Sequence, residues 1–275
     1  RVIGILTNTW QIVDGLKLRG RLSTDYTTRA TSSSSTSSIP LAFGYSGGFS
    51  LDSYQDRLLY GDVMLMYNKD ITQDFEIGAM VGYTGSEQKW VTINRGTDGG
   101  LSTENLFDIA ASVNTPWSGS SRSAIVKDAV LGTINGNYKN FLFLEGTLRN
   151  DRTSTMNPEN NSFFYPSVNS GFVFSEAFQL PTAISYAKFR ASWGIVGNYP
   201  DMYAANIAYN QNTLGVQAVG GQPVLYTTIP GNMGNDAIRP EEKHEYEFGL
   251  EAKFFVDRLG FDISYYNGLI KDQIL

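Results

Sequence analysis

The sequence predicts an all-β protein of the antiparallel up-and-down transmembrane β-barrel type. Apolar and polar residues alternate along many segments, and short connections between these segments alternate with long ones. Glycine and aromatic residues are abundant, with 28 Gly, 16 Tyr and 16 Phe in 275 residues, as expected of strands joined by many turns. We expect about ten strands on this pattern.

The alternating segments predict the strands one by one, because a repeat of two residues is the period of a strand and not of a helix. In chain order they are 1–10, 16–26, 59–67, 75–84, 130–138, 142–149, 164–174, 187–193, 245–254 and 259–266.

The last two segments show the pattern most clearly. Every second residue of the first is apolar: Tyr246, Phe248, Leu250, Ala252 and Phe254. The positions between them hold Glu245, Glu247, Gly249, Glu251 and Lys253. After a short turn at 256–258, Leu259, Phe261, Ile263 and Tyr265 alternate with Gly260, Asp262, Ser264 and Tyr266. This stretch therefore predicts a hairpin.

The lengths of the strands and connections favour a membrane barrel. Many segments have roughly 10 to 14 residues, whereas globular strands have about 5 or 6 and a tilted membrane strand needs about 9 to 11. Short turns are expected near 13–15, 68–74, 138–140 and 256–258, with a somewhat longer one at 175–182. Long connections are expected at 27–56, 85–123, 150–162 and 198–243. This alternation places all long loops on one side, as in outer-membrane barrels.

Two of the long connections have a distinctive composition. Residues 31–38 are TSSSSTSS, a polar low-complexity stretch that predicts a flexible loop. Residues 198–243 carry several tyrosines among Asn, Gly and Gln, and connections of this length are commonly functional or disordered.

The two faces of the strands differ, and we expect the apolar face to contact lipid and the charged face to line a polar interior. The predicted interior charges are Lys17, Arg19, Arg21, Lys188, Arg190, Glu245, Glu247 and Glu251. Aromatic residues gather near strand ends, as in the girdles of membrane barrels. They are Trp10, Tyr26, Tyr67, Tyr83, Tyr138, Trp193, Tyr246 and Tyr265.

The composition argues against several other classes of protein. A net charge of −6 disfavours nucleic-acid binding, and the absence of Cys removes disulfides and thiolate metal sites. A single histidine, His244, excludes sites that need two. No motif of nucleophilic, phosphate-binding or metal-dependent catalysis occurs, so we expect no catalytic residues, no metal and no cofactor. The abundant carboxylates leave an acid–base pair open.

Three motifs resemble the barrel of SusC/RagA-type TonB-dependent outer-membrane transporters of Bacteroidetes. The motifs are FRASWGIVGNYP (189–200), NDAIRPEEKHEYEFGLEAKFF (235–255) and RLGFDISYYNGLIKDQIL (258–275). In the first motif and the residue before it, the positions that match the family pattern are Lys188, Arg190, Ser192, Gly194, Gly197 and Asn198. Those of the second are Asn235, Glu241, Tyr246 and Gly249, with Ile238 a near match. Those of the third are Tyr265, Tyr266, Asn267, Lys271 and Asp272.

The resemblance extends to segments 15–26 and 144–176, so it covers most of the chain outside the loops. Three positions depart from the family pattern. Pro240 stands where the family usually has Trp, Asp236 where it has Pro, and Arg152 where it has Gly. These departures are small and leave the resemblance standing.

The resemblance implies that residues 1–275 form part of a single barrel domain of 22 strands in the outer membrane. The plug domain, with its TonB box, and the N-terminal extension would then lie outside this chain. It also implies active import of a large nutrient, more often an oligosaccharide than a peptide, with energy delivered through TonB. A SusD-like surface lipoprotein would act as a lid over the transporter.

Five aromatic residues are candidates for contact with the substrate or the lid. They are Tyr199, Tyr203, Tyr209, Tyr226 and Trp117. Aromatic rings could stack on sugar rings, grip the lid or stiffen the loop. Three other functions stay open: a passive porin, a barrel-type outer-membrane enzyme such as a protease or lipase, and a soluble β-sandwich binding module.

Overall fold

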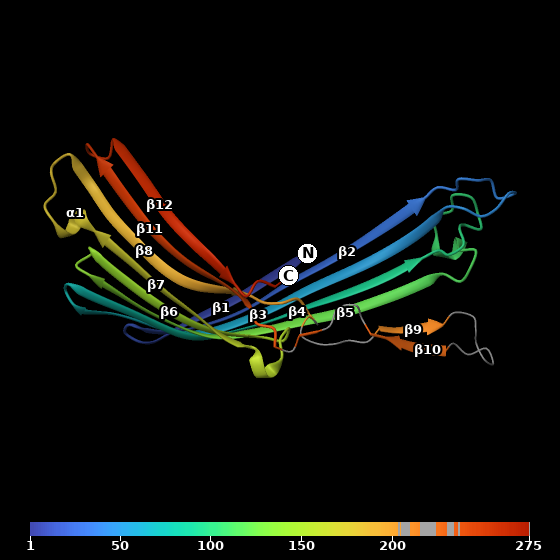
Figure 1. The fold of residues 1–275 in the computed structure, drawn as a ribbon, viewed down its shortest axis with the longest axis horizontal. Coiled ribbons are helices and arrows are strands. Elements are labelled where there is room, and N and C mark those ends of the chain that lie inside the picture. Colours follow the sequence, from blue (N-terminus) through green and yellow to red (C-terminus); the bar gives the residue numbers. More distant parts are fainter. Residues whose placement is uncertain (203, 205–209, 215–223, 230–233, 236, 275) are drawn as a thin grey trace. The chain divides into compact units, whose positions relative to one another are not determined.

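The chain forms an antiparallel meander of long strands. The computed structural model describes residues 1–202, 204, 210–214, 224–229, 234–235 and 237–274. Ten strands of this part of the chain form one sheet in the order β1-β2-β3-β4-β5-β6-β7-β8-β11-β12, and β9 pairs separately with β10 (Figure 1). Neighbours in the large sheet follow one another in the chain, except that β11 pairs with β8. The prediction of an up-and-down antiparallel architecture is confirmed.

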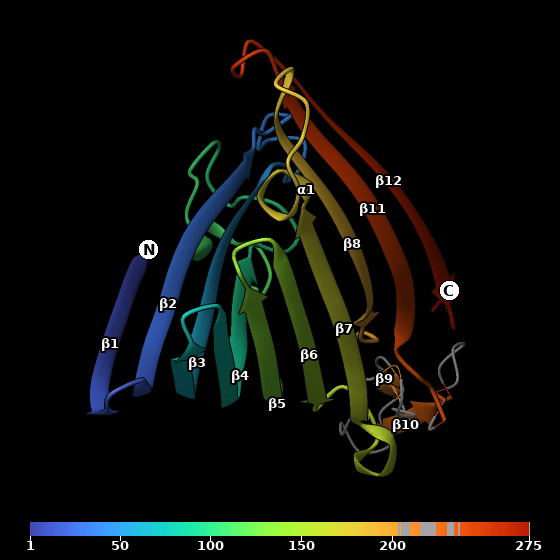
Figure 2. The same cartoon turned by 90° about the vertical axis from the view of Figure 1, so that its left-hand side faces the viewer.

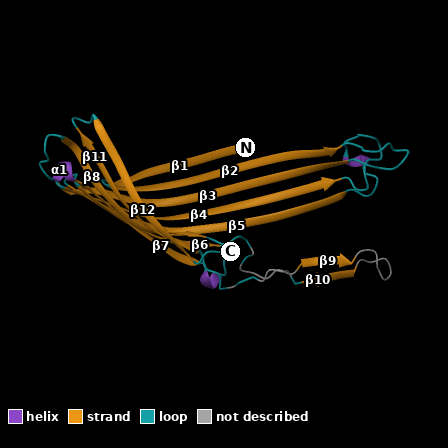
Figure 3. Cartoon of the chain, turned by 45° about the horizontal axis from the view of Figure 1, so that its top comes forward, coloured by secondary structure: helices purple, strands orange, loops and turns teal. Residues whose placement is uncertain are grey.

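Strands account for nearly all of the regular structure (Figure 3). Their bounds are β1 (Val2–Val13), β2 (Leu16–Ser35), β3 (Gly48–Thr72), β4 (Phe75–Gly96), β5 (Trp117–Tyr138), β6 (Leu142–Thr153), β7 (Ser162–Val173), β8 (Ile184–Asn198), β9 (Asn210–Leu214), β10 (Val224–Thr228), β11 (Glu241–Phe254) and β12 (Leu259–Lys271). The helical pieces are η1 (Ile109–Ala111), η2 (Pro158–Asn160) and α1 (Phe174–Ala177). Among the residues described, no helix is long and apolar enough to cross a membrane.

The chain divides into two compact units, which we describe separately. The first unit contains Arg1–Thr7, Arg21–Gly61 and Ser86–Val126, and the second contains Asn8–Gly20, Asp62–Gly85 and Lys127–Leu275. The second unit holds β6 to β12 and all the short turns of the large sheet.

The short turns lie where the sequence predicts them. β1 and β2 are joined by Asp14 and Gly15, and the other tight turns are 73–74, 139–141 and 255–258. Gly15 has φ of 78°, and a Cβ there would lie 2.5 Å from the carbonyl oxygen of Asn68. Only glycine meets both conditions, so this turn is specified by the sequence.

The long connections are shorter than the sequence predicts, because the strands extend into polar sequence. The loop expected at 27–56 is confined to 36–47, and the one expected at 85–123 to 97–116. The prediction that TSSSSTSS forms a flexible loop is wrong for residues 31–35, which complete β2. Strand pairing depends on backbone hydrogen bonds, so polar and β-branched residues continue a ladder whose side chains alternate poorly.

In the first unit, the two long loops 36–47 and 97–116 fold together. Leu101 is completely buried and Ala111 is nearly so, although both lie in loop sequence. The amide of Leu101 donates to the carbonyl of Ser46 at 3.1 Å, which joins the two loops. The Ser37 amide donates to the Asn105 side chain at 2.8 Å, which joins them a second time. We call this pair of loops the loop cap.

In the second unit, β6, β7, β8, β11 and β12 lie side by side (Figure 2). The large apolar side chains of one face are exposed, among them Val168 on β7, Trp193 on β8 and Leu250 on β11. Few apolar side chains are buried in the part of the chain that is described. A sheet face that is apolar and uncovered fits contact with lipid and not with water.

Candidate functional site

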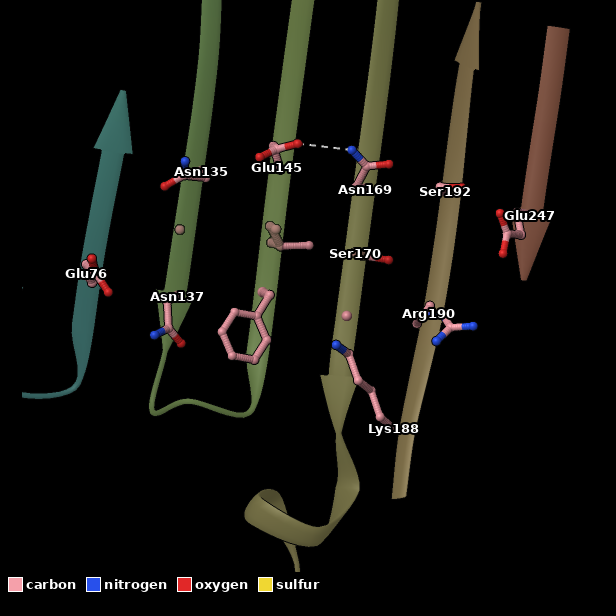
Figure 4. Close-up of a pocket in the computed structure, with 14 residues that line it drawn as sticks. Glu76, Asn135, Asn137, Glu145, Asn169, Ser170, Lys188, Arg190, Ser192 and Glu247 are labelled. Carbon is pink, nitrogen blue, oxygen red and sulfur yellow. Dashed lines mark hydrogen bonds between the residues drawn. The ribbon is translucent and has the colours of Figure 1, made fainter. Parts of the chain in front are cut away.

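A polar trough lies on the opposite face of the second unit (Figure 4). It has a volume of roughly 610 Å³ and is lined by residues of β4, β5, β6, β7, β8 and β11. Its lining residues are Glu76, Asn135, Gly136, Asn137, Phe143, Leu144, Glu145, Asn169, Ser170, Gly171, Lys188, Arg190, Ser192 and Glu247. Carboxylates, amides and cations therefore line the trough, together with one aromatic ring.

The pairing register explains why these residues meet. Asn135 pairs with Glu145, Glu145 with Asn169, Asn169 with Ser192, and Ser192 with Glu247. Directly paired residues in antiparallel strands project to the same face, at about 4.8 Å from strand to strand. One row of five polar side chains thus runs across five strands, from residues more than 100 positions apart in the chain.

The next row on the same face contains Phe143, Gly171, Arg190 and Gly249. Two of its members are glycines, which place no side chain of their own on this face.

The charged side chains of the trough are in part committed to partners. The Asn169 amide donates to the Glu145 carboxylate at 3.1 Å. The Arg190 guanidinium donates to both carboxylate oxygens of Asp262 on β12, at 3.0 and 2.7 Å. The trough can therefore accept hydrogen bonds through Glu145 and Glu247, and Lys188 adds a cation at its edge.

The groups that commonly take part in catalysis lie elsewhere or are few in the described part of the trough. The single histidine, His244, lies on β11 outside the lining, and its Nε2 is 3.1 Å from the Glu242 carboxylate. Within the described ranges, no group of three or more His, Asp or Glu side chains could hold a metal ion.

The structure brings together three of the predicted interior charges, namely Lys188, Arg190 and Glu247, in the trough. Glu251 pairs with Lys188, and Glu245 pairs with Gly194, so both share this face of β11. The Glu245 carboxylate is ion-paired with Lys243.

The other three predicted charges alternate along β2 and do not line the trough. Arg19 lies 3.6 Å from the buried carboxylate of Asp62. Arg21 lies over the ring of Tyr60, with 5.3 Å from the guanidinium carbon to the ring centroid. Lys17 is exposed.

The aromatic candidates are in different environments. Trp117 begins β5 in the first unit and is 46% exposed. Tyr226 lies on β10, pairs with Asn212 and is 40% exposed. Tyr203 and Tyr209 lie outside the described residues.

Tyr199 is held by its neighbours at the point where the chain leaves β8. Its ring meets the ring of Tyr165 edge to face, with centroids 6.5 Å apart, and Lys127 Nζ lies 5.7 Å from its centroid. Its hydroxyl is buried, and burial raises the pKa of Tyr199 well above its usual range. The ring therefore packs against Tyr165 and near Lys127 at the start of the long connection.

Sequence analysis did not identify Asn135, Glu145, Asn169, Ser192 and Asp262 as site residues. The sequence does indicate on which face of the sheet they lie, because each occupies a polar position in the alternating pattern of its strand. Counting back from the 139–141 turn also pairs Asn135 with Glu145. The register between β8 and β11 could not be obtained in this way, because no tight turn joins them.

Comparison with known proteins identifies related barrels. The family described as "TonB dependent receptor-like, beta-barrel" matches residues 5–275. No curated protein sequence matches the chain. The fold is similar to that in "Structure of the RagAB peptide transporter", with a TM-score of 0.84, 19% identity and coverage of 96% of this chain. It is less similar to the siderophore receptor PiuA from Acinetobacter baumannii, with a TM-score of 0.54, 12% identity and 96% coverage.

The chain spans only part of these relatives. It covers 29% of the RagAB transporter chain and 39% of the PiuA chain. The stronger likeness to the RagAB structure agrees with the SusC/RagA-type resemblance of the motifs, which lie in β8, β11 and β12.

Proposed function

We propose, because the chain belongs to the TonB dependent receptor-like β-barrel family, that it forms part of the wall of an active importer of a large nutrient. The family consists of outer-membrane transporters, and the protein belongs in the outer membrane. Import would be driven from the inner membrane through TonB, which would contact a region of the protein outside this chain.

One observation carries the proposal: the strands of the second unit are apolar and exposed on one face and polar on the other. A wall of this kind separates lipid from a hydrated interior through which a polar cargo can pass. The trough offers carboxylate, amide and hydroxyl groups to such a cargo, as hydrogen-bonding partners in place of water.

The proposed cargo is an oligosaccharide or a peptide, and the proposed partner is a SusD-like surface lipoprotein acting as a lid. The motif resemblance favours the oligosaccharide. Similarity to structures of a peptide importer in "open-open" and "closed-closed" states supports the peptide, and also suggests a moving part.

We further propose that residues 1–275 belong to a single barrel domain of 22 strands, with the plug domain elsewhere in the protein. Trp117 and Tyr226 are exposed enough to stack on cargo or contact the lid. Tyr203 and Tyr209 are proposed for the same contacts. Tyr199 would contribute by holding the start of its loop in place.

The proposal can be tested on the native protein in two steps. Outer membranes are extracted in mild detergent, and the mass of the intact assembly and its co-purifying proteins is recorded. Uptake of labelled oligosaccharide and peptide is then compared in cells with and without TonB. We expect a chain far heavier than 30.4 kDa with a lipoprotein companion, and uptake that is lost without TonB.

Uptake that persists without TonB, together with steady ion conductance in planar bilayers, would instead indicate a passive porin. Hydrolysis of the cargo by the purified protein would indicate an enzyme. A strain that lacks only residues 201–239 tests the long connection. It should insert the barrel normally but lose uptake or lid binding. Unchanged uptake would overturn the proposal that this loop contacts the cargo or the lid.

A further inference from the structure

We propose that Gly249, which has no side chain, provides a passage over β11 for the side chain of Arg190. We further propose that the two residues together fix the register of pairing between β8 and β11, and we call this arrangement the clamp. Arg190 starts on β8, passes over β11 and reaches β12. There its guanidinium bonds both carboxylate oxygens of Asp262, at 3.0 and 2.7 Å, and the Ser264 hydroxyl at 3.1 Å. One side chain thus connects three strands.

The path of Arg190 leads directly over Gly249. Arg190 pairs with Gly249, and Gly249 pairs with Ser264, so the three lie in one row. A Cβ on residue 249 would lie 2.7 Å from Nε and 2.8 Å from Nη2 of Arg190. Real Cβ atoms essentially never approach other atoms this closely, so a larger residue at position 249 would require the flexible end of the Arg190 side chain to move from this position.

The requirement for glycine here is one of space and not of backbone conformation. Gly249 does not have a left-handed φ, unlike Gly15 at 78°. An alanine could adopt the backbone of Gly249, and the group that its Cβ would meet is the Arg190 guanidinium. This separates the proposal from the usual reason for a glycine in a strand.

The other side chains on this face of β11 would all block the path. They are Glu245, Glu247, Glu251 and Lys253, which share the phase of Gly249. If β11 slipped by two residues against β8, Arg190 would face Glu247 or Glu251 in place of the gap. The guanidinium would then be unable to reach β12, so the bidentate pair with Asp262 would be lost.

The junction between β8 and β11 is where such a device is needed. Every other pair of neighbouring strands in the ten-stranded sheet is consecutive in the chain. At the end of the sheet that carries the short turns, five of these pairs are joined by connections of ten residues or fewer. β8 and β11 are separated by residues 199–240, so no turn dictates which residues pair. A slip by two residues would keep each side chain on its face and would be opposed only by specific contacts such as this one.

The clamp can be tested with cysteine pairs, since residues 1–275 contain no cysteine. Ala191 pairs with Phe248 on the apolar face of the sheet, which we call the outer face; the face with the trough is the inner face. In the full-length protein in its native membrane, Ala191→Cys with Phe248→Cys reports the native register. Ala191→Cys with Leu250→Cys, or with Tyr246→Cys, reports a slip by two residues. Cross-linking is compared in four backgrounds: native, Gly249→Ala, Arg190→Ala, and the double substitution.

We expect the native background to form the 191–248 disulfide and almost none of the slipped ones. Gly249→Ala should raise slipped cross-linking several-fold. In the Arg190→Ala background, where no side chain needs the passage, Gly249→Ala should have no further effect. Gly146→Ala is the matched control, since a Cβ there would approach no atom closer than 3.8 Å.

Two outcomes would overturn the proposal. One is that Gly249→Ala changes cross-linking equally with and without Arg190, which would assign the glycine a backbone role. The other is that neither substitution changes the register. If Gly249→Ala does not accumulate in the membrane, restoration of its level by Arg190→Ala supports the passage, and failure to restore it refutes the passage.

Discussion

The two faces of β8, β11 and β12 share one backbone but differ in which side chains they require. On the outer face, Phe189, Leu250 and Ile263 form a row in which each side chain is exposed. On the inner face, Arg190 crosses Gly249 and bonds Asp262. The outer face is constrained by chemical type, because lipid accepts any apolar shape. The inner face is constrained by the identity and position of single residues.

The largest effect on stability should come from placing a charge on the outer, apolar face. Leu250 lies midway between Tyr246 and Phe254 on β11, which places it near the middle of the apolar band. Leu250→Arg should destabilise the inserted protein by about 2–4 kcal/mol, the cost of a cation near the bilayer midplane. Reversible unfolding from lipid vesicles by denaturant measures this.

The control for Leu250→Arg is Ser192→Arg on the inner face of β8, next to Glu247. A hydrated face tolerates a cation beside a carboxylate, so this change should cost less than about 1 kcal/mol. Equal losses for the two substitutions would mean that the faces have been assigned wrongly.

The second effect concerns the anchor of the long connection. A Cβ on Gly197 would lie 2.0 Å from the hydroxyl oxygen of Tyr165, so Gly197→Ala must displace that ring and its contact with Tyr199. We expect a loss of about 1–3 kcal/mol, as for overpacking elsewhere, and faster protease cleavage after residue 199. Limited proteolysis followed by mass spectrometry locates the cut.

Gly132→Ala provides the comparison for this anchor, since a Cβ there would approach no atom closer than 3.7 Å. It should leave both stability and the cleavage pattern unchanged. If Gly197→Ala behaves in the same way, Tyr165 and Tyr199 do not hold the loop.

A smaller effect is expected within the trough. The Asn169 amide donates to the Glu145 carboxylate in a partly hydrated setting. Asn169→Ala should therefore cost only about 0.5–1 kcal/mol. A double-mutant cycle with Glu145→Gln isolates the pair, and a coupling indistinguishable from zero would show that the two side chains act separately.

The smallest effect tests whether the outer face ignores shape. Ile263→Leu keeps the number of carbon atoms, and lipid tails impose no rigid packing, so stability should change by less than about 0.5 kcal/mol. The same denaturant unfolding applies. A loss above 1 kcal/mol would indicate that Ile263 packs against protein.

Much of the fold could be predicted from sequence, because each hairpin carries its own local signal. The alternation of 245–254 and 259–266 predicts β11 and β12, and the turn between them sets their register, with Phe254 opposite Leu259. The faces follow from the same alternation. The sequence accordingly predicts that Lys188, Arg190 and Glu247 face the interior, and the structure brings them together in the trough.

Other parts depend on information that alternation does not contain. The sequence predicts the end of β2 too early and the start of β3 too late, because polar strand sequence resembles loop sequence. The trough joins Asn135 to Glu247 through four strand pairings, and the error of one pairing passes to the next. Gly249 belongs to the second motif, but the role we propose for it depends on Arg190 and Asp262 together.

The loop cap of the first unit has a thermodynamic consequence. Leu101 is buried, and the bonds from Leu101 to Ser46 and from Ser37 to Asn105 hold its two loops before any ligand arrives. Ordering a free backbone costs roughly 1–2 kcal/mol per residue, and a loop that is already folded spares its binding partner that entropy. Whatever docks on these loops should therefore do so nearly as a rigid body, with an affinity determined by the contacts it makes and little lost to rearrangement.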